Sequence, residues 1–424
     1  MGYERIRVRM AMLDIQELRK RPEKVQENFI RRGTDISVEE ILSLDRERLR
    51  LQTDVQKLRH EKNQLSKQVA CRKKQGQEAE DLLRQIDGLG EKADGLAAAL
   101  REKAEELQAV LIRLPNLLDD EIGERDEVLY QWKERPVFSF SPADHMELCK
   151  RLGLVDYETA GRLMGGGYWI YRGAGARLEW ALLNFCLEEN QKAGYEMLML
   201  PPVAREQCGF GAGQFPKFSH EVFRIQESEL FLIPTAETIL VNLYGNQMLK
   251  ESELPLKYTA YTPCFRKETG KNPKERGMVR GHQFNKVELA QITTPEQSDE
   301  AFGQILSQAE ALMRRLELHY RVVKLAAAEC SFGMARTYDI QVWLPAEQAY
   351  MEVSSVSNAR EYQARRTNTR YRDENGKIHH VHTLNGSGLA TSRLFAAILE
   401  QNQEEDGHVR IPEVLVPRMG TNIL

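Results

Sequence analysis

One stretch in the middle of the chain, RGHQFNKVE from residue 280 to 288, alternates residue types that could do chemistry. On a β-strand every second residue faces the same side, so one face would carry a cation at Arg280, an aromatic ring at Phe284 and a carboxylate at Glu288. Such a set could hold a nucleotide phosphate, a flat base and an ammonium group. His282 and Lys286 share this face, and the solvated side of an ordinary antiparallel hairpin would explain the same alternation.

A second polar stretch, AYMEVSSVSN at 349–358, is expected to form a strand that pairs with the preceding TYDIQVWLPA at 337–346. Its carboxylate, Glu352, lies beside the hydroxyls of Ser354 and Ser355. This combination suits a hydrated Mg²⁺ that accompanies a nucleotide. A solvent-facing edge strand is the alternative.

A third stretch, 377–403, predicts a strand, a glycine-rich turn and a helix. The turn at Gly386 and Gly388 and the start of the helix would offer backbone amides to a phosphate. Arg393 would lie in the first turn or two of the helix, where a cation opposes the dipole and is suited to an anion. Three nearby histidines lack a matching Cys or Asp set and are interpreted as strand surface rather than metal ligands: His379, His380 and His382.

Thr235, Ala236 and Glu237 follow Pro234 and precede an apolar run. A threonine followed by a glutamate at such a junction could cap a helix. It could equally form a small polar pocket for a substrate hydroxyl and amine.

The elements that must position these residues are strands and helices of a mixed domain. We expect strands at 258–266 and 278–289 joined by a charged loop, a strand at 194–202, and helices at 173–192 and 294–319.

The first quarter of the chain has a different pattern. Apolar residues at heptad-like spacing run from about residue 38 to 72 and again from 86 to 114, and a polar break at 73–77 and Pro115 bound them. An antiparallel helical hairpin is predicted, each helix about 50 Å long. Residues 46–74 carry ten Lys and Arg against three acids, whereas 78–106 carry nine acids against four bases. Cross-helix ion pairing explains part of this asymmetry. The alternative is that the first helix grips a phosphate backbone, with Arg72, Lys73 and Lys74 near its tip.

The bulk properties suggest a cytosolic protein of two or three domains. The chain has 424 residues and a net charge of −4, so a basic partner surface would have to be local. Its six cysteines are scattered without a CxxC pair, which favours free thiols in a reducing compartment over zinc or disulfides. No apolar run approaches the roughly 18 residues of a membrane span, and the N-terminus lacks a signal core.

Three separated blocks resemble the three motifs of class II aminoacyl-tRNA synthetases. They are GYEMLMLP, which ends at Pro201, FRKE at 265–268 with RGHQF at 280–284, and GSGLATSR at 386–393. Within that class the chain resembles the seryl-tRNA synthetase family, through the helical arm and the stretches PTAE, HQFNKVEL, TYDIQVWLP, EVSSVSN and HTLNGSGLA. The resemblance extends from Met12 to Gly420.

This resemblance implies an α+β fold, in which an antiparallel coiled-coil arm precedes a class II antiparallel β-sheet domain flanked by helices. The implied organisation is an extension at 1–11, a tRNA-binding arm at 12–116 with its coiled coil at about 38–114, and a catalytic domain at 117–424. The implied activity is ATP-dependent activation of L-serine to seryl-adenylate and transfer to serine tRNA. A cytoplasmic homodimer that uses ATP and Mg²⁺, with no zinc and no membrane, is expected.

The resemblance also implies roles for individual residues. The dimer motif ends at Pro201, Glu352 and Ser355 would bind Mg²⁺, and Arg72, Lys73 and Lys74 would contact tRNA. The serine pocket would comprise Thr235, Ala236, Glu237, Glu288, Asn385 and Ser387. The ATP site would comprise Arg266, Lys267, Glu268, Arg280, Phe284, Glu352, Val353, Ser354, Ser355 and Arg393.

Residues 352 and 355 have opposite parity, so a regular strand could not aim both at one ion. A bulge or kink near Ser354 is therefore required.

Several positions depart from the family pattern. The loop at 269–279 is one residue shorter than usual, AAAE replaces CTGD at 326–329, and Thr391-Ser392 replaces Val-Gly. They suggest a divergent member, such as a second copy. Two other functions stay open: a ligase that passes activated serine to a non-tRNA acceptor, and an RNA-binding or scaffolding paralogue without activity.

Overall fold

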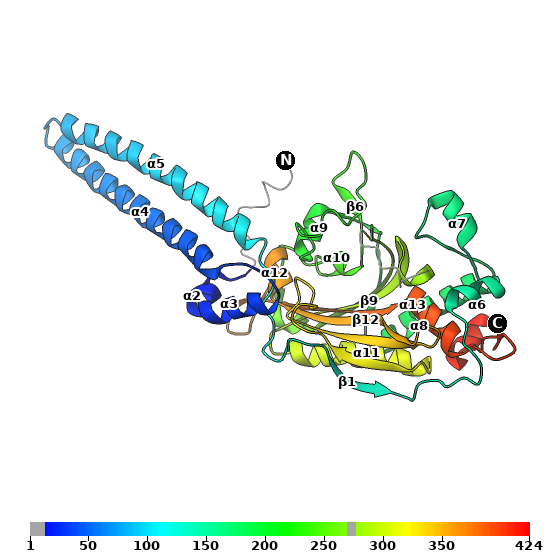
Figure 1. Ribbon diagram of the computed structural model, residues 1–424. Coiled ribbons are helices and arrows are strands. Elements are labelled where there is room, and N and C mark those ends of the chain that lie inside the picture. The colour runs from blue at the N-terminus through cyan, green and yellow to red at the C-terminus, as the bar shows by residue number, and fades with distance from the viewer. Residues whose placement is uncertain (1–12, 269–276) are drawn as a thin grey trace. The chain divides into compact units, whose positions relative to one another are not determined.

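The computed structural model describes residues 13–268 and 277–424, which form two compact units that join between Leu114 and Pro115 (Figure 1). The predicted extension at 1–11 and most of the shortened loop, 269–276, lie outside the described residues. No helix among the described residues is both long and apolar enough to cross a membrane.

The first unit is helical. Two short helices, α2 (Ile15–Lys20) and α3 (Pro22–Arg31), precede the long pair α4 (Val38–Lys74) and α5 (Glu80–Leu111). The Ser37 hydroxyl caps α4 by accepting a hydrogen bond from the Glu40 amide. The helices pack along the predicted apolar seam, where Val55, Val69 and Leu107 are buried. The predicted helical hairpin is confirmed.

The second unit is built on an eight-stranded sheet with the strand order β1-β10-β11-β12-β15-β9-β8-β4. All neighbours are antiparallel except β4 and β8, which are parallel. In that order the strands are β1 (Glu127–Trp132), β10 (Tyr320–Lys324), β11 (Arg336–Leu344), β12 (Ala349–Arg360), β15 (His382–Ala390), β9 (Gln283–Thr293), β8 (Leu256–Phe265) and β4 (Glu196–Met199).

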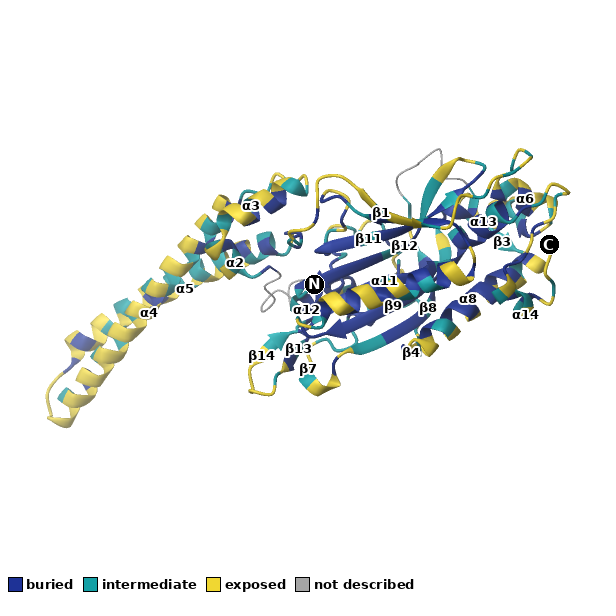
Figure 2. Cartoon of the chain, turned by 90° about the horizontal axis from the view of Figure 1, so that it is seen from below, coloured by how far each residue is buried: buried dark blue, intermediate teal, exposed yellow. Residues whose placement is uncertain are grey.

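Three amphipathic helices cover the sheet: α8 (Ala174–Lys192), α11 (Ser298–Arg315) and α13 (Thr391–Gln401). Their apolar faces and the central strands form the buried core seen in Figure 2. Figure 1 shows α8 and α11 on one side of the strands and α9 (Glu206–Gly211) and α10 (Glu237–Leu240) on the other. One face of the sheet is thus devoted to packing, and the other is available for a site.

The remaining elements are short. Three small sheets pair β2 (Val155–Asp156) with β3 (Ile170–Tyr171), β5 (Val203–Arg205) with β6 (Leu230–Leu232), and β7 (Met248–Lys250) with β13 (Arg370–Arg372) and β14 (Ile378–His380). The other helices are α6 (His145–Arg151), α7 (Tyr157–Met164), α12 (Tyr362–Thr367), α14 (Val416–Met419) and the 3₁₀ turns η1 (Glu251–Glu253), η2 (Gly277–Val279) and η3 (Glu413–Leu415).

The predicted bulge is present in β12. Ile340 pairs with Ser354, but Gln341 pairs with Glu352, so Val353 is the extra residue. The Val353 side chain is buried in the core, while Glu352 and Ser355 both line a cavity on the opposite side. The bulge thus turns Glu352 and Ser355 to the same side of the strand, which a regular strand could not do.

Two predictions of local structure were wrong. The strand β9 begins only at Gln283, so Arg280 and His282 precede it; the backbone there is held by the Gly167 carbonyl, which accepts from the His282 amide at 2.9 Å.

The prediction of a glycine-rich turn is also wrong, because Gly386 and Gly388 lie inside β15. A Cβ at Gly386 would meet Ile305 Cγ2 at 2.5 Å, and one at Gly388 would meet Asn190 Nδ2 at 3.0 Å. The two glycines therefore allow close packing of β15 against α11 and α8. They do not form a turn that could hold a phosphate.

Candidate active site

A cavity of about 440 Å³ brings together residues from the three polar stretches at 280–288, 349–358 and 377–403. A smaller hollow of about 70 Å³ adjoins it and shares Arg266, Glu268 and Arg280. Phe284 and Arg393 line only the smaller hollow. Predicted site residues that line the larger cavity are Thr235, Glu237, Arg266, Glu268, Arg280, Glu288, Glu352, Ser355, Asn385 and Ser387.

One end of the larger cavity holds a buried carboxylate that already has partners. Glu288 is 1% exposed, and its Oε2 accepts from Thr235 Oγ1 at 2.6 Å and pairs with Lys286 Nζ at 2.5 Å. The position of Glu288 in the middle of β9, between β15 and β8, makes this group rigid. Lys286 thus places a cation directly against this buried carboxylate.

A second carboxylate, Glu237, faces the same cavity from the start of α10. Gln363 Nε2 donates to Glu237 Oε1 at 2.7 Å, and Thr383 Oγ1 donates to Gln363 Oε1 at 2.6 Å. Burial first, and the nearby Glu288 carboxylate second, raise the pKa of Glu237 to about 7. This end of the cavity thus carries the carboxyl groups of Glu237 and Glu288 and the ammonium group of Lys286, a set that suits a ligand with a positive charge.

Thr235 bears on both interpretations that the sequence left open. Its hydroxyl donates to Glu288 and accepts from the Glu237 amide, two residues later, at 3.2 Å. The N-cap of α10 is Ala236, which makes no side-chain cap hydrogen bond, so the predicted helix cap is wrong, and the Thr235 side chain lines the cavity instead.

Arginines and an aromatic ring gather where the two hollows meet. The Arg266 guanidinium lies 5.1 Å from the Phe284 ring centre, and Arg280 Nη2 pairs with Glu268 Oε2 at 2.7 Å. Arg393 Nη1 donates to the Glu352 carbonyl at 2.8 Å. Three guanidinium groups beside an aromatic plate form a surface for phosphates and a flat base.

The residues around Glu352 fit a divalent cation. Asp339, which the sequence reading missed, is 7% exposed, and its Oδ1 is buried without a hydrogen-bond partner. Burial, and then the Glu352 carboxylate, hold the pKa of Asp339 well above its usual range. Two carboxylates and the Ser355 hydroxyl are oxygen ligands of the kind that Mg²⁺ takes together with water and phosphate oxygens. Within the described ranges, no group of three or more His, Cys, Asp or Glu gathers as a metal site.

Several predicted residues do not place their side chains on the cavity. Ala236 and Val353 are buried in the core, and the Ser354 hydroxyl donates to the Ser387 carbonyl at 2.6 Å. Lys267 lies near the Phe223 ring. Pro201 is exposed just after the edge strand β4.

The proposed RNA contacts lie at the tip of the helical hairpin. Arg72 Nη1 pairs with Asp81 Oδ1 at 3.0 Å, which is cross-helix ion pairing. Lys73 and Lys74, in the last turn of α4, are exposed. Of the three basic residues at the tip, one therefore pairs across the two helices and the other two are exposed.

The sequence reading did not select Lys286, Gln363 or the loop at 331–334, which also line or support the cavity. Lys286 was on the predicted face, and its position beside Glu288 was a usable signal. Gln363 follows from no spacing, because α12 reaches Glu237 only through the tertiary fold.

Comparisons with known proteins agree over the whole chain. Residues 12–118 match the family of the seryl-tRNA synthetase N-terminal domain, and residues 218–402 match the tRNA synthetase class II core domain (G, H, P, S and T). The chain is 46% identical to serine–tRNA ligase 2 of Clostridium acetobutylicum over 425 residues, which is 97% of this chain and 100% of that relative.

Solved structures give the same similarity. The seryl-tRNA synthetase of Pyrococcus horikoshii in complex with ATP has a TM-score of 0.93 at 33% identity, and the alignment covers 97% of this chain and 99% of that one. The cytoplasmic serine–tRNA ligase of Naegleria fowleri in complex with AMP has a TM-score of 0.89 at 25% identity, covering 98% and 99%.

Proposed function

Because the chain belongs to the seryl-tRNA synthetase family, we propose that it activates L-serine with ATP and transfers the seryl group to serine tRNA. The observation that carries this proposal is the cavity in which Glu237 and Glu288 lie next to the cluster of Arg266, Arg280 and Phe284. An ammonium site beside a phosphate and base site is what the first half of the reaction needs.

In that half-reaction a carboxylate oxygen of serine bonds to the α-phosphorus of ATP, and pyrophosphate leaves. The serine carboxylate is already a nucleophile, so no general base is required. The protein has to align the two groups and stabilise charge on the α-phosphate. We assign this role to Arg266, and the outer phosphates to Arg280 and Arg393. Adenine would stack on Phe284, and Glu268 would lie near the nucleotide.

We propose that Glu352 and Ser355 hold Mg²⁺, which would neutralise phosphate charge when bound. The bulge at Val353 supports this assignment, because it turns both side chains toward the cavity. The buried Asp339 oxygen without a partner is a further oxygen ligand at the same place.

Serine would be selected by polar groups. Thr235, Glu237, Glu288, Asn385 and Ser387 line the cavity, and a ligand without a hydroxyl leaves buried partners unpaired, at about 1–3 kcal/mol for each group. We propose that the ammonium group of serine supplies a second cation, which together with Lys286 balances the carboxylates of Glu237 and Glu288.

We propose that residues 12–116 form the tRNA-binding part and 117–424 the catalytic part. The family match of residues 12–118 and the exposed Lys73 and Lys74 support a role of the helical hairpin in gripping the RNA backbone.

A homodimer through the β4 edge is also proposed. Met199 is 95% exposed there, and Trp180 of α8 is 57% exposed, so this apolar edge is suited to a second copy. The likeness to the cytoplasmic enzyme of Naegleria fowleri supports a cytoplasmic location.

Serine-dependent exchange of pyrophosphate into ATP, followed by transfer to serine tRNA, tests the proposal. Each is measured for the whole chain and for a form in which a short linker replaces 38–111. We expect both activities in the whole chain and only exchange in the shortened form. Absence of exchange would refute serine activation, exchange without transfer in the whole chain would indicate a non-tRNA acceptor, and full transfer by the shortened form would contradict the role of the hairpin.

A further inference from the structure

The segment at 115–122, which begins the second unit, holds one wall of the larger cavity. This wall is the loop at 331–334, which joins β10 to β11 and lines the larger cavity. The segment itself contributes no residue to the lining of either hollow.

Asn116 is the centre of the attachment. Its amide donates to the Phe332 carbonyl at 2.9 Å, and its Nδ2 donates to the carbonyls of Gly333 at 3.0 Å and Ala359 at 2.8 Å. The residue is 6% exposed. It therefore links the wall to the end of β12, the strand that carries Glu352 and Ser355.

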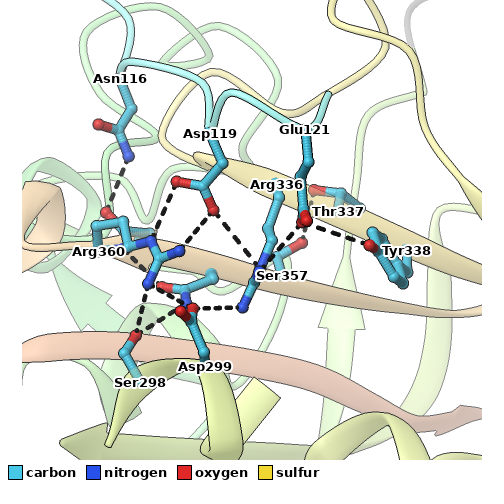
Figure 3. Close-up of polar contacts among 12 residues, drawn as sticks. Asn116, Asp119, Glu121, Ser298, Asp299, Arg336, Thr337, Tyr338, Ser357 and Arg360 are labelled. Carbon is cyan, nitrogen blue, oxygen red and sulfur yellow. Dashed lines mark hydrogen bonds and ion pairs between the residues drawn. The ribbon is translucent and has the colours of Figure 1, made fainter. Parts of the chain in front are cut away.

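Asp119 fixes the same segment a few residues later. Its amide donates to the Ala335 carbonyl at 2.9 Å, and its carboxylate accepts from Arg360 Nε at 3.1 Å and Nη2 at 2.7 Å. Figure 3 shows this ionic cluster between the segment and the strand ends. Leu118 and Ile122 of the segment also pack in one apolar cluster with Ala327 and Cys330, which precede the wall in the chain.

The wall also has neighbours beyond the segment, near Gly333. A Cβ added to Gly333 would reach ordinary contact distance, 3.4 Å from Tyr362 Cε1 and 3.9 Å from the Ala212 carbonyl oxygen, so the space there holds little more than a methyl group. Closely packed neighbours transmit small shifts. Releasing the loop from Asn116 would move the wall relative to the residues across the cavity.

The wall belongs to one side of the site. Residues 331–334 line the larger cavity, together with Thr235 and Glu237, and are absent from the smaller hollow that contains Phe284 and Arg393. A displacement of the wall should therefore affect an amino acid bound near Glu237 more than a base stacked on Phe284.

We propose that Asn116 is a positioning residue for the amino-acid side of the cavity, acting through the wall at 331–334. This inference rests on the proposed serine and ATP sites. It predicts that removing the two side-chain hydrogen bonds raises the KM for serine and leaves the KM for ATP nearly unchanged.

The experiment compares Asn116→Ala and Asn116→Asp with the wild type in the full chain. Both variants lose the donors to Gly333 and Ala359, and aspartate keeps the size and the acceptor for the Leu117 amide. In pyrophosphate exchange we expect the KM for serine to rise about tenfold in both, and the KM for ATP to stay within about twofold.

Asp299→Asn is the matched control. Asp299 pairs with Arg336 and Arg360 at 2.7 Å but is exposed and lies on α11, outside the segment. Both KM values should remain within about twofold of the wild type in this variant. An equal rise of both KM values in the Asn116 variants, or no rise, would overturn the proposal.

Hydrogen exchange measured by mass spectrometry tests the attachment independently of activity. Peptides that cover 325–335 should exchange at least about tenfold faster in Asn116→Ala, while peptides from β8 and β9 keep their wild-type rates. Unchanged hydrogen exchange in 325–335 would refute the attachment of the wall by Asn116, even if no serine activation were found. Lack of serine-dependent exchange in the wild type would refute the proposed function alone.

Discussion

The pair of carboxylates in the cavity allows a prediction that links stability to ligand binding. Glu237 is buried beside Glu288, and Lys286 supplies a compensating cation that pairs with Glu288. We predict that Glu237→Gln stabilises the empty protein at pH 8 and weakens serine binding. Gln363 Nε2 can still donate to the amide oxygen, so the local hydrogen bonding is retained.

The magnitude follows from the proton that Glu237 holds. Its pKa is about 7 in the folded protein, against 4.5 for an ordinary glutamate. Between these values the folded state binds more protons than the unfolded state, so the free energy of unfolding falls as pH rises. At 1.36 kcal/mol for each pH unit the wild type loses about 3 kcal/mol between pH 4.5 and 7, and the glutamine variant does not.

Thermal melting of both proteins at pH 5 and pH 8 measures this difference. At pH 8 we expect the variant to melt about 5 °C above the wild type, and at pH 5 the two should agree closely. In exchange assays the wild-type KM for serine should fall as pH rises from 6 to 8, because an ammonium ligand requires the ionised carboxylate.

If the KM for serine of Glu237→Gln equals that of the wild type at both pH 6 and pH 8, the role of Glu237 in binding the ammonium group is refuted. Melting temperatures that change with pH in the same way in both proteins would refute the raised pKa. The two outcomes are separable because the second needs no substrate.

Three further predictions concern other parts of the site. Arg266→Ala should lower serine-dependent exchange at least about 100-fold, whereas Lys267→Ala, outside the cavity lining, should stay within about threefold; near-normal exchange in the first would refute its assignment. Changing Lys73 and Lys74 to Ala should weaken serine tRNA binding and reduce its salt slope by about 2 without affecting exchange, and an unchanged slope would place the RNA elsewhere. Changing Glu352 to Gln should remove the charged ligand from the proposed Mg²⁺ site, so serine-dependent exchange should fall by more than about 100-fold while circular dichroism stays native; retained exchange would contradict the metal assignment.

Much of the fold was predictable because its signals are local. Heptad spacing gave α4 and α5, and alternation gave the β11–β12 hairpin. The bulge in β12 was inferred from the parity of Glu352 and Ser355, which were expected to meet at one ion. Strand alternation and the expected metal ligands together therefore predicted the bulge, which neither would have predicted alone.

The failures occur where tertiary contacts decide local structure. The start of β9 is displaced because His282 bonds to Gly167 and because Gly281 packs under Trp169, with a Cβ position 2.2 Å from Cζ3. The glycines of β15 are needed under Ile305 and Asn190, although the same residues suit a turn. Single-residue preferences cannot distinguish these uses.

The candidate site was predicted in its lining but not in its support. The sequence motifs marked Glu237 and Glu288 because their types suit an ammonium ligand. Gln363 and Asn116 act through hydrogen bonds to residues far away in sequence, and nothing in their spacing reveals these partners. Asp339 was part of a strand pattern in which a buried carboxylate was not separable from a surface one.

The position of the junction between the two units has a consequence for chimeras. The helical unit ends at Leu114, and Asn116 already belongs to the hydrogen-bonded frame of the second unit. An exchange of arms between relatives that is spliced before Pro115 leaves this frame intact. A splice a few residues later places foreign side chains in the segment that holds the wall, so such a hybrid would change amino-acid affinity together with the properties of the exchanged helices.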